Sequence, residues 1–300
     1  MVEKRTLRGS FFWSVLPDSL FLQSMKIRYD CCRILNFHLH LTGALTALHV
    51  NFMITKAQIK LIQSLKNARD RSREGLFVVE GVKMVEELVN SKFEIVNIYA
   101  TTDWTVPQSK RKLHIDAIEE WELERISSLT TPNKVLAVAK IPAQETMEEI
   151  KDELILLLEQ INDPGNMGTI IRTAEWFGIN RVVASEDSVD VWNPKVVQAS
   201  MGSVFRMKLN SVNIKDFLKQ NRSLPVYGTL LEGDDLNSVQ LTPTGIIIIG
   251  NESHGISAAT IPFITRKITI PAANTSGSES LNASIATAIV CYEFRKQFPV

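Results

Sequence analysis

The sequence has few cysteines, no net charge and no long apolar run, and each absence excludes a class of protein. Its 300 residues contain three cysteines, Cys31, Cys32 and Cys291, without the spacing of a CxxC or zinc motif. We therefore expect no disulfide framework, no metal site and a reducing, cytoplasmic setting. Lys and Arg equal Asp and Glu at 33 each, so any basic surface for nucleic acid must be local. No apolar run is long enough to span a bilayer, so we expect no membrane partner.

Two common nucleotide-binding fingerprints are also missing. Neither the GxGxxG of dinucleotide sites nor the GK[ST] of a P-loop occurs in the chain. The composition, 45% hydrophobic and 22% charged, is typical of a folded protein with one large domain or two of ordinary size.

The chain divides by composition into four segments. Residues 1–52 keep neither a helical nor a strand period, and we interpret them as a leader outside the functional fold; a genuine extension or targeting segment is the alternative. Met53 opens an ordinary amphipathic segment. Residues 53–141 predict a small α/β domain, 142–152 a charged linker after Pro142, and 153–300 a second α/β domain.

Strand and helix patterns alternate in both domains, which predicts α/β architecture. In the first we expect a helix over 54–68, a basic turn, a strand in LFVVE, a turn at Glu80–Gly81, a helix to Val89 and strands within 93–102 and 134–142. In the second, the apolar run LILLLEQI predicts a strand buried on both faces of a parallel sheet. A helix over 168–179 follows, and about six strands in all predict an open sheet.

Three polar loops follow strands of the second domain, where open α/β sheets bind ligands. In 162–174, Gly165 and Gly168 allow close backbone approach, and Arg172 is expected beside a helix N-terminus, which favours a phosphate. The alternative to a phosphate site is an ordinary turn followed by a solvent-exposed Arg. In 245–257, four isoleucines lead into a polar loop between Gly250 and Gly255. His254 in that loop is expected to be a packing residue rather than a catalyst.

The third loop leads into the last helix. Apolar side chains recur near the helical period, which predicts a stripe facing the core: Leu281, Ile285, Ala288, Ile289 and Tyr292. The preceding SGSESLN carries more polar residues than one helix cap needs.

These loops resemble the signature motifs of the SpoU (TrmH) family of RNA ribose 2′-O-methyltransferases. The first, N-x-G-x-x-x-R, is matched by Asn166, Gly168 and Arg172, and the second, G-x-E-x-x-G, by Gly250, Glu252 and Gly255. The third, I-P … S-L-N-x-S, is matched by the following residues: Ile270, Pro271, Ser280, Leu281, Asn282 and Ser284. The loop before Ser280 is slightly longer than is typical of the family. Residues 53–140, with LFVVEG, are similar to the ribosomal-protein-like (L30e-like) domain that precedes it in many members.

The resemblance implies a SPOUT fold with an open, mostly parallel sheet and a C-terminal trefoil knot. It also implies a homodimer that uses S-adenosylmethionine to methylate a ribose 2′-OH in structured RNA. A guanosine of 23S rRNA is the favoured target. A tRNA target, or an inactive RNA-binding module, is the alternative, and a phosphate- or metabolite-binding enzyme is a weaker one.

The resemblance also assigns roles to residues. Arg172 is the family's candidate for taking the proton from the reacting hydroxyl. Removing the proton of a guanidinium at pH 7 costs about 7 kcal/mol, so we expect Arg172 to act as a fixed cation. Catalysis is further assigned to these residues: Asn166, Glu252, Ser280 and Asn282. Cofactor binding is assigned to these: Gly250, Asn251, Ile270, Pro271 and Leu281.

A basic stretch near the start of the first domain is the candidate RNA contact. Residues 53–75 hold six basic side chains against Asp70 and Glu74. A solvated helix face would explain them equally well, but beside a methyltransferase domain they favour binding to RNA phosphates. The predicted contacts are Lys66, Arg69, Arg71 and Arg73.

Overall fold

The computed structural model describes residues 54–109, 111–143, 150–273 and 280–299. The expected leader, 1–52, lies outside the described residues, as do 144–149 of the expected linker and 274–279 of the long loop. The described residues lie within one compact unit, Asn51–Val300, which contains two separate sheets. The expected boundary between two domains stays a prediction.

The smaller sheet has four strands. In spatial order they are β1 (Leu76–Glu80), β4 (Val135–Lys140), β2 (Ile95–Ala100) and β3 (Ile115–Ala117). Strand β4 runs antiparallel to both neighbours, whereas β3 runs parallel to β2. The three strands expected from the sequence are confirmed. Strand β3 was not predicted, because three residues are too few to show a period.

Helices cover both faces of this sheet. Alternate side chains of β1 face opposite ways: Phe77 and Val79 pack with α4 (Val82–Asn90), and Val78 packs with α2 (Lys56–Ser64) and α5 (Glu120–Ile126). The predicted turn after Glu80 is present, with Gly81 at φ 90°.

The basic segment after α2 corrects one prediction. The sequence predicted one helix over 54–68 and then a turn, but α2 ends at Ser64 and a second helix, α3 (Ala68–Glu74), follows. Its segment, ARDRSRE, buries only Arg71, so no apolar stripe reveals it. Gly75, at φ 64°, ends the helix in the left-handed conformation.

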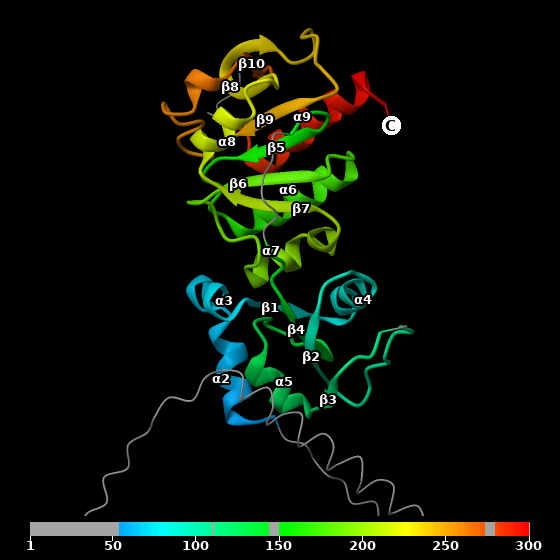
Figure 1. The fold of residues 1–300 in the computed structure, drawn as a ribbon. Coiled ribbons are helices and arrows are strands. Elements are labelled where there is room, and N and C mark those ends of the chain that lie inside the picture. The colour runs from blue at the N-terminus through cyan, green and yellow to red at the C-terminus, as the bar shows by residue number, and fades with distance from the viewer. Residues whose placement is uncertain (1–53, 110, 144–149, 274–279, 300) are drawn as a thin grey trace, which may run out of the picture. The chain divides into compact units, whose positions relative to one another are not determined.

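The larger sheet has six strands, all parallel (Figure 1). In spatial order they are β10 (Arg266–Thr269), β8 (Val226–Asp235), β9 (Gly245–Ile249), β5 (Leu154–Leu158), β6 (Arg181–Ser185) and β7 (Lys208–Val212). The chain proceeds outward from β5 to β7 and then continues on the other side of β5. The neighbours β5 and β9 therefore flank the point where the strand order reverses, the usual ligand position in such sheets.

Helices on both faces bury this sheet, which explains why β5 and β9 are uninterrupted apolar runs. Leu156 and Leu158 face a core formed with α6 (Pro164–Trp176), α7 (Pro194–Ala199) and α9 (Ala283–Gln297). Ile155 and Leu157 face α8 (Ile214–Gln220) on the other side. The predicted α/β fold with a mostly parallel sheet is confirmed. None of the described helices is long and apolar enough to cross a membrane.

The last helix presents the opposite face from the one predicted. Four members of the expected core stripe are exposed: Leu281 at 46%, Ile285 at 52%, Ile289 at 37% and Tyr292 at 58%. The face that packs on the core carries Ala283, Thr287, Val290, Cys291 and Phe294. Both faces of α9 have the helical period, so periodicity alone did not distinguish them. Small Ala283 and Thr287 suit the close packing of α9 against α6.

Candidate active site

The loop after β5 differs from the prediction in where its helix begins. Helix α6 starts at Pro164, with Asp163 as its cap accepting a 2.7 Å hydrogen bond from the amide of Asn166. Arg172 therefore lies two turns inside the helix rather than beside its N-terminus. Gly168 lies against α7, since a Cβ there would be 2.5 Å from that of Ala199. Its small size thus serves helix packing rather than a ligand.

The loop after β9 closes on itself. Asn251 and Gly255 exchange two backbone hydrogen bonds, of 3.1 and 2.9 Å. A Cβ at Gly250 would lie 2.4 Å from the carbonyl carbon of Gly255, so this turn requires glycine. Asn251 also donates from Nδ2 to the carbonyl of Gln160 over 2.9 Å, which ties the loop to the end of β5. His254 is exposed.

Three side chains from the three motifs form a continuous hydrogen-bonded chain. Asn166 Nδ2 donates to Glu252 Oε1 over 2.6 Å, and Asn282 Nδ2 donates to Asn166 Oδ1 over 3.0 Å. Ser280 Oγ lies 3.5 Å from the backbone carbonyl of Glu252. The structure thus brings together Asn166, Glu252, Ser280 and Asn282 at the carboxyl ends of β5 and β9. We call this set the motif cluster.

Asn282 has two structural connections at once. Its Oδ1 caps α9 by accepting from the amides of Ser284 and Ile285, at 2.9 and 3.4 Å, while its Nδ2 reaches Asn166. The crowded helix entrance is therefore both a cap and part of the motif cluster.

The motif cluster retains unused hydrogen-bonding capacity. Glu252 uses one carboxylate oxygen within it, and the other has no partner among the described residues. Asn166 and Asn282 each use one N–H of their Nδ2 groups, which leaves a second donor on each. Such a cluster can orient a small polar group placed against it.

Arg172 does not join the motif cluster within this chain. Its side chain is exposed and makes no hydrogen bond or ion pair with another described residue. It shares the exposed face of α6 with Thr169 and with Trp176, which is 84% exposed. This face lies on a helix that packs against α9, whose apolar stripe is also exposed.

Four of the five predicted cofactor residues directly follow β9 or β10, and the fifth, Leu281, lies just before the cap of α9. Ile270 is half-buried, whereas Pro271 and Leu281 are exposed. Their side chains offer apolar surface beside loop backbone, which suits an organic ligand with a flat apolar part rather than a metal. Within the described ranges, no three His, Cys, Asp or Glu side chains are placed to hold a metal ion.

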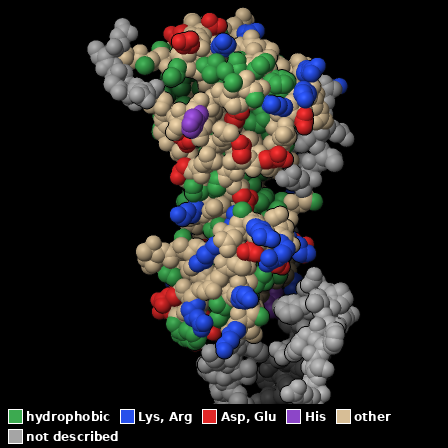
Figure 2. Space-filling view, turned by 90° about the vertical axis from the view of Figure 1, so that its left-hand side faces the viewer, with side chains coloured by type: hydrophobic (Ala, Val, Ile, Leu, Met, Phe, Trp, Pro, Cys, Tyr) green, Lys and Arg blue, Asp and Glu red, His purple; other side chains and the backbone are tan. Residues whose placement is uncertain are grey.

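Three of the four predicted RNA contacts are exposed in the structure, but the fourth is buried, so its prediction is wrong. Arg71 is 1% exposed, ion-paired with Asp190 at 2.6 Å and bonded to the carbonyls of Leu65 and Lys66, so it is structural. Lys66 and Arg69 are exposed, while Arg73 is 61% exposed and paired with Asp70 and Glu74. Figure 2, seen from the side of α2 and α3, shows Lys and Arg side chains gathered over this part of the molecule.

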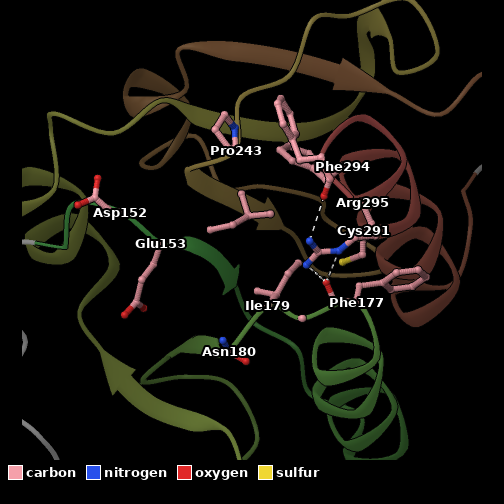
Figure 3. Close-up of a pocket in the computed structure, with 12 residues that line it drawn as sticks. Asp152, Glu153, Phe177, Ile179, Asn180, Pro243, Cys291, Phe294 and Arg295 are labelled. Carbon is pink, nitrogen blue, oxygen red and sulfur yellow. Dashed lines mark hydrogen bonds between the residues drawn. The ribbon is translucent and has the colours of Figure 1, made fainter. Parts of the chain in front are cut away.

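The opposite, amino edge of the large sheet carries a group of residues that the sequence did not indicate. Glu153 accepts hydrogen bonds from Arg181 and Lys208, each at 2.9 Å, and the Arg181 bond holds the pKa of Glu153 below its usual value. A cavity of about 220 Å³ lies beside them (Figure 3). There Arg295 donates to the backbone carbonyls of Phe177 and Phe298. Burial raises the pKa of Cys291 in its wall to about 12, so that thiol is inert at neutral pH.

A parallel sheet with a polar cluster at its switch point is the arrangement in which α/β proteins bind ligands. Comparisons with known proteins identify the family. Residues 153–292 match the model of the SpoU rRNA methylase family, and residues 56–137 match that of an MRM3-like substrate-binding domain.

Comparisons with individual proteins point to the same family. The chain is 39% identical to a TrmH-family protein of Porphyromonas gingivalis of known structure, over 82% of this chain and 99% of that one, with a TM-score of 0.73. It is 26% identical to the SpoU methyltransferase AviRb of Streptomyces viridochromogenes, solved with AdoMet, over 81% and 98%, also with a TM-score of 0.73. It is 26% identical to the 23S rRNA (guanosine(2553)-2′-O)-methyltransferase RlmP of Bacillus subtilis, over 79% of this chain and 96% of that protein.

The chain belongs to the SpoU rRNA methylase family. The resemblance and the enzyme class expected from the sequence, an RNA ribose 2′-O-methyltransferase, are confirmed.

Proposed function

We propose that this protein uses S-adenosylmethionine to methylate one ribose 2′-OH in 23S rRNA, at the carboxyl edge of its large sheet. The observation that carries the proposal is the chain of hydrogen bonds Glu252–Asn166–Asn282. It joins three motifs that are far apart in sequence, and it keeps unused donors and an unused acceptor.

S-adenosylmethionine would supply the methyl group from its sulfonium and would be held by Gly250, Asn251, Ile270, Pro271 and Leu281. Leu281 is 46% exposed although it is a large apolar side chain. The tightly closed loop at Gly250 keeps backbone rather than a side chain at the strand end. Both features fit an adenosine-sized ligand better than open solvent.

The side chains of the motif cluster would position the ribose. A methyl transfer requires the hydroxyl in line with the methyl group and its proton polarised or removed. Glu252 offers a carboxylate oxygen, and Asn166 and Asn282 offer N–H donors, so together they can fix the hydroxyl's orientation. Arg172 would remain a cation, bind the adjacent phosphate and stabilise the negative charge that develops on the oxygen.

The exposed stripe of α9 supports a homodimer. Ile285, Ile289 and Tyr292 form an exposed apolar surface on one helix, of the kind that marks protein interfaces. Trp176 on the adjacent α6 extends it. Because Arg172 lies on that same face of α6, a second copy of the chain would cover it and could complete its site. An active site shared between subunits would explain why Arg172 has no partner within the described part of one chain.

Three finer features belong to the same proposal. We infer a trefoil knot at β9, which lies between β8 and β5 in the sheet although it follows β8 in sequence; the likeness of the chain to SpoU structures supports this. We infer that the small sheet and its helices bind RNA as an L30e-like domain, supported by the match to a substrate-binding domain and by exposed Lys66 and Arg69. Guanosine as the target is supported by the relative from B. subtilis.

Methyl transfer to defined RNAs tests the proposal. The purified full chain is incubated with radiolabelled S-adenosylmethionine and, separately, with unmodified transcripts of 23S rRNA, 16S rRNA and tRNA, and the methylated ribose is then mapped. We expect one 2′-O-methylguanosine in 23S rRNA. A methylated uridine would correct the nucleotide, transfer to tRNA would correct the substrate, and no transfer to any ribose despite cofactor binding would refute the activity.

A further inference from the structure

Two consecutive residues at the end of β5 hold both ends of the loop that follows β9. That loop, residues 250–257, carries Asn251 and Glu252 of the proposed site. Glu159 contacts its C-terminal end, and Gln160 contacts its N-terminal end. Neither belongs to the three sequence motifs.

Glu159 is a buried carboxylate surrounded by donors from the last residue of the loop, Ser257, and from Thr260 just after it. It is 5% exposed, and its Oε1 accepts from the hydroxyls of Ser257 and Thr260, at 2.6 and 2.8 Å. Its Oε2 accepts from the amide of Ser257 at 3.2 Å. A buried carboxylate is costly unless it is hydrogen-bonded, so this position strongly favours the loop conformation that supplies those donors.

Gln160 has a backbone conformation that few residues other than glycine adopt. Its φ is 56°, in the left-handed region, which is disfavoured for a residue with a Cβ. Three hydrogen bonds hold it there. Its amide donates to Ser185 Oγ at 2.9 Å, its side chain donates to Asp187 at 2.7 Å, and its carbonyl accepts from Asn251 at 2.9 Å. Strained backbone that is held in this way is typical of functional sites.

We propose that Glu159 is a positioning residue for cofactor binding. It fixes the C-terminal end of the 250–257 loop while the carbonyl of Gln160 fixes Asn251 at the other end. The backbone at Gly250 and the carboxylate of Glu252 are thereby held ready before any ligand arrives. A loop that is already ordered loses less conformational entropy on binding, so the affinity for S-adenosylmethionine depends on Glu159. This inference rests on the proposed function.

The small sheet offers a matched control. Glu80 is the last residue of β1, much as Glu159 directly follows β5. It is 6% exposed and accepts hydrogen bonds from the hydroxyl of Ser127 and the amide of Ser128. It therefore has the same chemistry as Glu159 but lies away from the motif cluster. Removing either carboxylate leaves buried donors unpaired, so both substitutions should lower stability in a similar way.

The test measures S-adenosylmethionine affinity by calorimetry, well below the melting temperature of each variant. We expect Glu159→Ala to raise Kd about tenfold or more, Glu159→Gln to restore most of the affinity, and Glu80→Ala to leave Kd unchanged. Ser257→Ala, at a half-buried position, should raise Kd about threefold and remains measurable if Glu159→Ala does not fold. Combined with Glu159→Ala it should add little, because both remove the same contact.

A wild-type Kd in the folded Glu159→Ala or Ser257→Ala variant would overturn the inference. An equal loss of affinity in Glu80→Ala would also overturn it, because the effect would then be one of general stability. Failure of the wild-type protein to bind S-adenosylmethionine would instead refute the proposed function, so the two outcomes are distinct.

Discussion

The two edges of the large sheet carry similar numbers of polar groups but use them differently. At the amino edge, Glu153 is satisfied by Arg181 and Lys208, and the donors of Arg295 are taken by backbone carbonyls. At the carboxyl edge, Glu252, Asn166 and Asn282 bond one another and still have unused capacity, and Arg172 has no partner in the described part of the chain. The difference teaches that a cavity alone does not mark a site, since the polar groups beside the amino-edge cavity are already paired, whereas those of the motif cluster keep unused donors and an unused acceptor.

The largest expected effect comes from removing the unpaired cation at the carboxyl edge. Arg172→Ala should lower methyl transfer by about 10³-fold or more, because it removes charge stabilisation needed in the transition state. Calorimetry should show S-adenosylmethionine binding within about twofold of wild type, since no cofactor contact is lost.

Arg206→Ala is the matched control for that variant. Arg206 is also partly exposed but is paired with Glu87 and Glu175, so we expect near-normal turnover and a small loss of stability. Near-normal methylation by Arg172→Ala would contradict the assigned role.

The next largest effect tests the apolar stripe that adjoins the carboxyl edge. Ile289→Glu places a charge in the middle of that stripe and should convert a dimer into a monomer in analytical ultracentrifugation, with activity falling in parallel. Lys215→Glu, at an exposed position of α8 on the other face of the sheet, should leave the dimer intact. A wild-type protein that is monomeric at micromolar concentration would refute the shared site.

Asn282 allows its two roles to be separated. Asn282→Asp keeps the oxygen that caps α9 but loses the donor to Asn166, so we expect unchanged stability and about a 10- to 100-fold loss of turnover. Asn282→Ala should lose the same activity and also about 1 kcal/mol of stability. Initial rates and thermal unfolding of both variants give the answer. Full activity in Asn282→Asp would show that the chain of amides is merely structural.

The smallest effect is expected at the amino edge, where the polar side chains already have hydrogen-bond partners. The lowered pKa of Glu153 means that its ion pairs stabilise the fold above the pKa it has when unfolded, and that this stability is lost as pH falls through its lower folded value. Glu153→Gln should therefore lower the melting temperature by a few degrees at neutral pH, and the difference from wild type should shrink below about pH 4. Turnover at pH 7 should not change. A large loss of activity would mean that this edge takes part in the reaction.

Much of the fold and of the motif cluster could be predicted, because apolar runs such as LILLL and GIIII are typical of strands buried on both faces. Parallel strands place their carboxyl ends at one edge, so the polar loops that follow them were expected to meet. The exposed face of α9 could not be predicted, since Ile285 and Val290 have equal apolar character and only the packing of α6 distinguishes them.

Charged residues in unexpected places were the other source of error. The segment around Arg71 has the composition of a solvated helix face. Nothing in the neighbouring sequence shows that Arg71 is buried and paired with Asp190. Glu159 did carry a signal, because a carboxylate directly after five apolar residues, LILLL, is expected to be buried and hydrogen-bonded. The same signal occurs at Glu80, at the end of LFVVE.

A crystal structure of the chain with S-adenosylmethionine tests the central claim most directly. The account predicts cofactor density at the carboxyl edge, contacting Gly250, Ile270 and Leu281, with its methyl group facing the cluster of Asn166, Glu252 and Asn282. Density in the amino-edge cavity beside Arg295 and Phe177 would contradict it.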